Sequence, residues 1–470
     1  MPLLAGLYPD EVIKGKTVSF LQENGLSCFM YLIENVNVVN EGKVEKKSVL
    51  IENGLVSQIS DQIPHTEGVS VINGEGKYLL PGVIDTHVHF RDPGLTVKAD
   101  FYTESCAALA GGVTSVIDMP NTKPQTVSEQ TLDEKLAMAA EKSLVNYGFM
   151  VGATNGNIGE ISSIDPRKYA AIKLFMGSST GNMLVNSDSS LEDLFASAGK
   201  VIVAHCEDEE RIRERTDMFR NAGSNSPNIH PKIRDAESCF ISTQKAVALA
   251  KKYNARLHVA HLSTGKELSL FSSESLENKN VTAEVTPNHL WFCDDDYQRL
   301  GNLIRCNPAI KSANDREALR NALKDNIIDT IATDHAPHCM EEKMRPYFES
   351  VSGMPSIQHS LLVMLELVKR NVIDIGTLVE KMCHNPARLF SIENRGFIRE
   401  GYAADLVLVD MGSETQVTAE SLYYKCRWSP LEGETFSSKV LRTFVNGIPA
   451  YDCENGIFES IRGRSLKFSR

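Results

Sequence analysis

The sequence lacks the features that mark a disulfide-stapled, membrane-spanning or nucleic-acid-binding chain. Its ten cysteines among 470 residues form no CxxC pair, and this sparse usage predicts reduced thiols in a cytoplasmic protein. No apolar run approaches the roughly 20 residues of a transmembrane helix. The net charge is −12 and no long basic segment is present. Neither a membrane nor nucleic acid is therefore expected as the main partner.

The two ends of the chain differ from its middle. Residues 1–29 have neither the basic start nor the continuous apolar core of a signal peptide. We expect them to be a poorly ordered N-terminal extension, with Met30 as a second candidate start. Short β-type runs occupy residues 30–80, and similar runs return over residues 391–465, where Asn446-Gly447 is a hairpin signal. Neither set alone would bury a face, so we predict one small β-sandwich built from both ends.

The middle of the chain, residues 81–390, alternates short β-branched runs with helical stretches such as LDEKLAMAAEKS. Eight such β/α units predict a TIM barrel as the catalytic domain. A doubly wound open sheet is the alternative, but neither a GxGxxG nor a Walker motif supports it. The eight expected strands cover residues 82–90, 113–119, 145–151, 169–175, 200–206, 256–262, 281–287 and 329–334.

Metal-type side chains fall where these strands end, which is where TIM barrels carry their chemistry. His87 and His89 stand two apart on the first strand, so both point to one face and can hold one cation. Asp85 shares that face and is a candidate partner for a ring N–H. Three further strand ends carry His205, His261 and Asp334.

Two more strand residues need a separate interpretation. His258 precedes His261 by three residues, and we expect it to lie deeper, on the opposite face, with a structural role. Lys173 ends the fourth strand, where an ammonium would repel metal ions. Burial beside cations favours a neutral amine, which can add CO2 to become a carbamate that bridges two metals. Position alone leaves an ordinary salt-bridged lysine equally open.

Together these side chains predict metal-assisted hydrolysis of a carbonyl compound. Two cations about 3.5–4 Å apart can share and activate a hydroxide. Histidine and carboxylate ligands suit zinc best, although they leave other divalent ions open. Asp334 can bind one metal and accept the proton of the attacking hydroxide.

Several motifs in order resemble the amidohydrolase superfamily, and the dihydroorotases in particular, from about residue 30 to about residue 460. The set is specific although no single piece is. The motifs are HVHFRDPG, DMPNTKP, IKLF, VAHCEDE, VAHLSTG, RCNPAIKS, ATDHAPH and RWSPLEGETF. The resemblance implies a barrel with a β-sandwich, a binuclear zinc site, a homodimer, and reversible closure of N-carbamoyl-L-aspartate to dihydroorotate in pyrimidine (UMP) biosynthesis.

The resemblance also assigns roles to residues. His87, His89 and Asp334 match the ligands of a more buried metal, and His205 and His261 match those of a more exposed one. Lys173 matches a bridging carbamylated lysine, although some members use an aspartate there. Asp334 also matches the catalytic base and acid.

The expected substrate carries a carboxylate, and Arg91 is the residue that indicates it. A guanidinium binds a carboxylate with two parallel hydrogen bonds, whereas a lysine offers a point charge. Asn121 and His338 match further carboxylate contacts of the family, and Asn307 matches a contact to the ring amides. A surface salt bridge for Arg91 and a loop-capping role for Asn121 are the alternatives.

Two other functions remain open on the sequence alone. Another cyclic amidase, such as an allantoinase, hydantoinase or dihydropyrimidinase, would share the metal ligands. A non-catalytic metalloprotein that accompanies aspartate transcarbamoylase belongs to a different class, but the complete set of ligand positions argues against it.

Overall fold

The structure is a computed structural model that describes residues 30–177 and 183–469. The extension expected over residues 1–29 lies outside these residues. Within the described part of the chain, no helix combines the length and the apolar character needed to cross a membrane.

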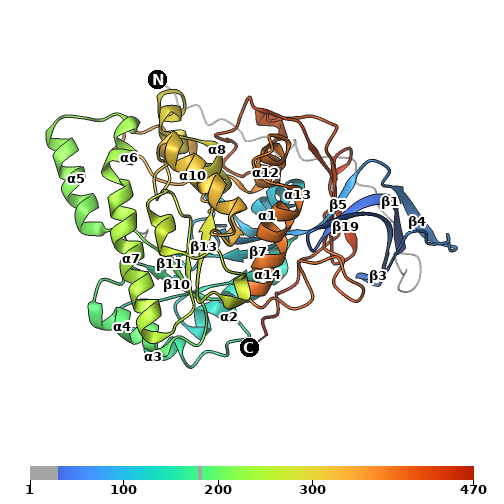
Figure 1. The fold of residues 1–470 in the computed structure, drawn as a ribbon, viewed down its shortest axis with the longest axis horizontal. Helices are drawn as coiled ribbons and strands as arrows, with labels where there is room; N and C mark the ends of the chain where they lie inside the picture. Colours follow the sequence, from blue (N-terminus) through green and yellow to red (C-terminus); the bar gives the residue numbers. More distant parts are fainter. Residues whose placement is uncertain (1–29, 178–182, 470) are drawn as a thin grey trace, which may run out of the picture.

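The middle of the chain forms a parallel β-barrel surrounded by helices, as the sequence predicted (Figure 1). Strand-end pairing between Val88 and His335 joins the last strand to the first and closes the barrel. The expected third strand is divided at Met150 into two short strands. The barrel strands are β6 (Val83–Val88), β7 (Val113–Asp118), β8 (Asn146–Phe149), β9 (Val151–Gly152), β10 (Ile172–Phe175), β11 (Ile202–His205), β12 (Leu257–Val259), β13 (Val281–Val285) and β14 (Thr330–Ile331).

Helices follow the strands and cover the outside of the barrel. The helix expected over 132–143 is α2, which begins after a Ser128 cap whose side chain accepts the Thr131 N–H. The α-helices are α1 (Phe101–Ala110), α2 (Glu129–Lys142), α3 (Ile158–Ile161), α4 (Asp188–Ser197), α5 (Glu209–Asn221), α6 (His230–Ile233), α7 (Ala236–Tyr253), α8 (Pro287–Trp291), α9 (Tyr297–Leu300), α10 (Ala313–Lys324), α11 (Met340–Lys343), α12 (Ser360–Lys369), α13 (Ile375–Val379) and α14 (Asn385–Leu389).

Strands from both chain ends join in one nine-stranded sheet beside the barrel, as predicted (Figure 1). In its middle, β15 pairs with β5 on one side and β18 on the other, so the two ends of the chain meet there. The sheet strands are β1 (Met30–Asn40), β2 (Lys43–Glu52), β3 (Leu55–Ser60), β4 (Val69–Asn73), β5 (Tyr78–Pro81), β15 (Leu406–Asp410), β18 (Lys439–Val445), β19 (Ile448–Asp452) and β20 (Gly456–Ile457). A separate two-stranded sheet joins β16 (Thr415–Gln416) and β17 (Thr435–Phe436).

The sequence of β15, LVLVD, shows why this strand is buried on both faces. Leu406 and Leu408 pack in the core of the sandwich, whereas Val407 and Val409 alternate with them and pack in the main core shared with the barrel. A strand of continuous apolar residues therefore lies between two cores.

Two Asn-Gly hairpins, one from each end of the chain, touch in this sheet. Asn53-Gly54 joins β2 to β3 and Asn446-Gly447 joins β18 to β19, and all four residues have positive φ, as a type I′ turn requires. A Cβ on Gly447 would stand 2.6 Å from the Cα of Gly54. Only glycine allows this approach, so the two turns fix how the ends of the chain meet.

The end of the chain then returns to the barrel. Tyr147 of β8 donates its N–H to the Arg464 carbonyl and accepts the N–H of Leu466. Leu466 and Phe468 are buried among barrel residues that include Ile84 and Val203. The chain from Arg464 to Phe468 thus packs against the barrel, so the range 391–465 predicted for the sandwich ends with two residues that lie beside β8.

Candidate active site

Six side chains from five barrel strands meet at the carboxyl ends of the strands. The Nε2 atoms of His87 and His89 lie 3.4 and 3.0 Å from Oδ1 of Asp334. Nζ of Lys173 lies 3.5 Å from Nε2 of His87. Nδ1 of His205 lies 3.0 Å from Nε2 of His261. The structure therefore brings together the six side chains that the sequence predicts to be metal ligands.

Most of these histidines are held by a second polar group that leaves the opposite ring nitrogen facing the centre. Nδ1 of His87 lies 2.8 Å from Oε1 of Glu284. Nδ1 of His89 lies 2.8 Å from Oδ1 of Asn121, and Nε2 of His205 lies 3.1 Å from Oε2 of Glu207. Each oxygen accepts the ring N–H, so a lone pair on the other nitrogen points inward, the arrangement that metal-binding histidines use.

Burial and charge keep the groups in the form that binds cations. Burial lowers the pKa of His89 to about 4, although Asp334 opposes the shift, and it lowers the pKa of His261 far below its usual value. Burial alone would raise the pKa of Asp334, but His87 and His89 outweigh it and hold this pKa well below the ordinary range. At neutral pH the site thus offers neutral imidazoles at His89 and His261 and an ionised carboxylate at Asp334.

Lys173 is the member that does not fit as a plain ligand. It is fully buried, and burial lowers its pKa to about 8 against the opposing charges of Glu284 and Asp334. At mildly alkaline pH, a substantial fraction of Lys173 side chains is therefore the neutral amine. Its fit to a metal centre improves if the amine is converted to an anion.

The donor set fits divalent cations. Ligand atoms of His87, His261 and Asp334 lie within 4.8 Å of one another. Four imidazoles and a carboxylate are the ligand types that zinc takes in proteins. His87, His261 and Asp334 could hold a cation together, and Lys173 lies beside this group, 3.5 Å from Nε2 of His87.

A cleft of roughly 530 Å³, including the open space at its mouth, joins these residues to a polar rim. Arg91 is buried at the rim, with Nε donating to the Pro337 carbonyl over 3.2 Å and Nη2 3.1 Å from Nε2 of His338. Asn121 and Asn307 also line the cleft. The buried Oδ1 of Asn307 has no hydrogen-bond partner among the described residues, so it is free to accept from a ligand.

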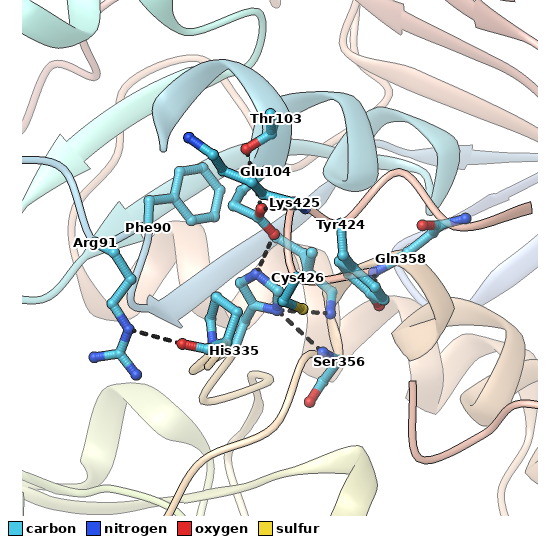
Figure 2. Close-up of polar contacts among 12 residues, drawn as sticks. Phe90, Arg91, Thr103, Glu104, His335, Ser356, Gln358, Tyr424, Lys425 and Cys426 are labelled. Carbon is cyan, nitrogen blue, oxygen red and sulfur yellow. Dashed lines mark hydrogen bonds and ion pairs between the residues drawn. The ribbon is translucent and has the colours of Figure 1, made fainter. Parts of the chain in front are cut away.

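A buried network behind the rim holds the end of the last strand (Figure 2). His335 lies between Glu104, whose Oε2 is 2.7 Å from its Nε2, and the Ser356 N–H, which donates to its Nδ1 over 3.0 Å. The ring of Tyr424 stacks on it. Because His335 accepts the His89 N–H through its carbonyl, this network fixes the first and last strands at the site.

Comparisons with known proteins agree with this geometry. A model of the amidohydrolase family matches residues 78–449. The dihydroorotase of Methanosarcina acetivorans is 34% identical over 412 residues, which cover 85% of this chain and 88% of the relative. The dihydroorotase of Pyrococcus abyssi is 34% identical over 409 residues, which cover 86% and 91%.

The chain belongs to the amidohydrolase family and, within it, to the dihydroorotases. Similar solved structures come from neighbouring groups of amidohydrolases. L-Hydantoinase from Arthrobacter aurescens has a TM-score of 0.88 at 27% identity, covering 93% of this chain and 100% of the other. Dihydropyrimidinase from Brevibacillus agri has a TM-score of 0.85 at 25% identity, covering 94% and 100%. The barrel with its sandwich is thus the fold of this amidohydrolase.

Two sequence expectations about supporting residues are wrong in this amidohydrolase. Asp85 does not contact a histidine ring: its carboxylate accepts the N–H groups of His87 and Thr333 and the Thr333 hydroxyl, and the ring is held by Glu284 from β13. His258 lies deeper than His261, as expected, but its ring turns into the barrel, 2.8 Å from the hydroxyl of Thr282 and 3.1 Å from that of Thr330.

The cause of the second error is the backbone of His261. Its φ is +40°, so the strand alternation that assigns opposite faces at a spacing of three no longer applies. Glu207 was also missed. It is fully buried, contacts His205 and pairs with Arg234. Its place two residues after His205 on the same motif was the available signal.

Proposed function

We propose that this chain opens the ring amide of dihydroorotate and, in reverse, closes N-carbamoyl-aspartate, with two zinc ions and a carbamylated Lys173. The observation that supports a substrate with a carboxylate is the position of Arg91, a buried guanidinium at the rim of a cleft lined by metal-type ligands. Its only described side-chain partner is a histidine, so its charge is available to an anionic group. A ring carboxylate supplies one.

The residues of the chain divide the work between them. Bound divalent cations would polarise the amide carbonyl and lower the pKa of the attacking water. Asp334 is ionised and accepts the proton of that water, then passes it to the ring nitrogen as the C–N bond breaks. In ring closure Asp334 starts protonated and gives its proton to the departing oxygen. Closure consumes a proton overall, so acidic pH favours the ring.

Four residues at the rim orient the substrate. Arg91 and His338 bind the carboxylate, and Asn121, which already holds the ring of His89, adds a contact beside them. Asn307 accepts from a ring N–H through its unpartnered Oδ1. These contacts place the reacting carbonyl over the histidines, and positioning of this kind supplies much of the catalysis of hydrolysis.

Lys173 becomes a ligand through reaction with CO2. Its neutral amine forms an N–C bond and loses a proton, which leaves a carbamate anion with two oxygens. The burial of the side chain and its lowered pKa support this step. Intact mass measured without acid should exceed the sequence mass by one CO2, and acid should remove the increment.

Turnover of three cyclic substrates by zinc-loaded protein tests the function. We expect dihydroorotate to be hydrolysed well above hydantoin and allantoin, and carbamoyl-aspartate to be cyclised at low pH. Chelation should abolish both activities and zinc should restore them. A higher kcat/KM on hydantoin than on dihydroorotate would show the second candidate, a hydantoinase, which the likeness to the Arthrobacter aurescens structure makes the alternative to test.

Location and assembly follow from the same proposal. We propose a cytoplasmic homodimer that binds only small molecules. Size-exclusion chromatography with light scattering should give about twice the chain mass of 51.9 kDa; a monomer at micromolar concentration would contradict it.

A further inference from the structure

The hydrogen bonds around His338 do not balance. Nζ of Lys98 lies 3.0 Å from its Nδ1 and Nη2 of Arg91 lies 3.1 Å from its Nε2. An ammonium and a guanidinium can only donate, but a neutral imidazole has a single lone pair to accept with. One of the two ring nitrogens must therefore present an N–H to a cation.

His335, three residues before His338 in the sequence, shows how a histidine of this region can satisfy both ring nitrogens (Figure 2). Its Nδ1 receives a backbone N–H and its Nε2 faces a carboxylate, so one tautomer satisfies both nitrogens. Among the described residues, His338 has no such carboxylate within hydrogen-bonding distance. The nearest, Oε2 of Glu342, is 3.6 Å from Nδ1, beyond hydrogen-bonding distance.

The ring of His338 is fixed in place, so it cannot escape the conflict by turning. Trp428 donates its indole N–H to the His338 carbonyl over 2.7 Å. A Cβ on Gly353 would stand 3.0 Å from Cδ2 of His338, so the ring edge packs closely on that glycine. Burial lowers the pKa of His338 to about 3, with Arg91 and Lys98 adding to the effect against Glu342. Protonation is thus no escape at neutral pH.

Local turns and an ion pair hold Lys98 in its contact with the ring. Two turns, from the Leu95 N–H to the Arg91 carbonyl and from the Lys98 N–H to the Leu95 carbonyl, bring Lys98 back over the histidine. Nζ also pairs with Oε1 of Glu342 at 2.8 Å. The side chain is 16% exposed.

We propose that Lys98 is a positioning residue that sets the tautomer of His338 for recognition of a carboxylate. Its ammonium occupies the Nδ1 lone pair, so the proton resides on Nε2, the nitrogen that faces Arg91. A carboxylate placed between Nε2 and Arg91 accepts from both and removes the clash of donors. The described residues of the rim therefore offer one anionic acceptor too few, and the substrate carboxylate supplies it.

This inference rests on the proposed function for the identity of the ligand, but the tautomer can be read without turnover. Histidine labelled with ¹⁵N in the zinc-loaded full chain reports which nitrogen is protonated, and loss of signal in His338→Gln assigns the resonance. With orotate as the carboxylate probe we expect Nε2–H on His338, and loss of that preference in Lys98→Met. An Nδ1–H tautomer in the wild type with orotate would overturn the proposal whatever the enzyme hydrolyses.

Kinetics test whether Lys98 acts through the histidine. Loss of one charge-assisted hydrogen bond should raise KM for dihydroorotate about 10- to 100-fold in Lys98→Met, with kcat nearly unchanged and Lys98→Arg restoring most of the loss. Lys77→Met, which breaks the ion pair with Asp410 on the sandwich sheet, is the matched control and should behave as wild type.

A double-mutant cycle separates tautomer control from simple attraction between charges. In the His338→Gln background, Lys98→Met should change KM by less than about twofold, because the group through which it acts is gone. A full KM effect in that background would mean that Lys98 attracts the carboxylate directly, and the proposal would fail. Absence of dihydroorotate turnover in the wild type would instead reject the proposed function and leave the tautomer measurement standing.

Discussion

Replacement of Arg91 by methionine gives the sharpest test of the substrate. Methionine keeps most of the length and apolar surface of the side chain but removes every donor. The guanidinium would make two charge-assisted hydrogen bonds to a carboxylate, each contributing roughly 1.5–3 kcal/mol. Allowing for incomplete additivity, a loss of about 3–4 kcal/mol corresponds to a fall of about 10²–10³ in kcat/KM.

The comparison that matters is between rings with and without a carboxylate. Dihydrouracil has the same ring amide and no carboxylate, so Arg91→Met should change its hydrolysis less than about threefold. Arg91 also donates to the Pro337 carbonyl, so the thermal midpoint and the zinc content of the variant must be measured. Arg320→Met is the matched control. Arg320 lies on helix α10, away from the cleft, and like Arg91 its Nε donates to a backbone carbonyl, that of Leu290, over 2.9 Å. Equal losses on both rings, in a variant that keeps its zinc, would refute the assignment of a carboxylate-bearing substrate.

Four other outcomes can be measured on single variants. Lys173→Ala should bind fewer than two zinc ions per chain and lose turnover; a variant that keeps both ions and its activity would exclude the carbamate. Glu284→Gln should weaken zinc binding about 10- to 100-fold in a competition with a chelating dye, because the charge that holds His87 is lost. Burial lowers the pKa of His359 to about 4 in the folded protein. As the pH falls below about 6.5, this histidine becomes protonated in the unfolded chain but stays neutral in the folded one. The free energy of unfolding therefore decreases between about pH 6.5 and pH 4. The loss at pH 4.5 is roughly 2–3 kcal/mol by urea unfolding, and His359→Gln should lack it. Phe468→Ala should lower the free energy of unfolding by about 3–5 kcal/mol, whereas truncation of the exposed Met218 should not.

Much of the fold followed from periodicity in the sequence. Eight β-branched runs identified the barrel strands because parallel strands covered by helices are apolar on both faces. The boundaries were less accurate: residues 256–262 were expected to be one strand, but β12 covers only Leu257–Val259. The backbone leaves the strand before His261 so that this residue can turn toward the centre, and no hydrophobic pattern records such a departure.

The ligands of the site were easier to predict than the groups that support them. Several histidines at the ends of barrel strands point to few functions other than metal binding. A glutamate such as Glu284 is a common residue type in any sequence, and its role becomes visible only when its distant neighbour His87 is known. His87 and Glu284 are 197 residues apart and meet because β6 and β13 are in one barrel. Such a contact forms because the strands close into a barrel, and the hydrophobic pattern of a single strand does not show which strands become neighbours.

The left-handed backbone at three site residues has a consequence for how this enzyme can evolve. Arg91, His261 and Asp334 have φ values of +66°, +40° and +49°, and each such residue with a side chain costs about 1–2 kcal/mol relative to an unstrained one. Glycine would relieve the strain at every one of them and would remove a functional group each time. Selection for thermal stability alone, with activity relaxed, should therefore erode these three positions first, and a library enriched for stability should contain inactive chains with glycine there.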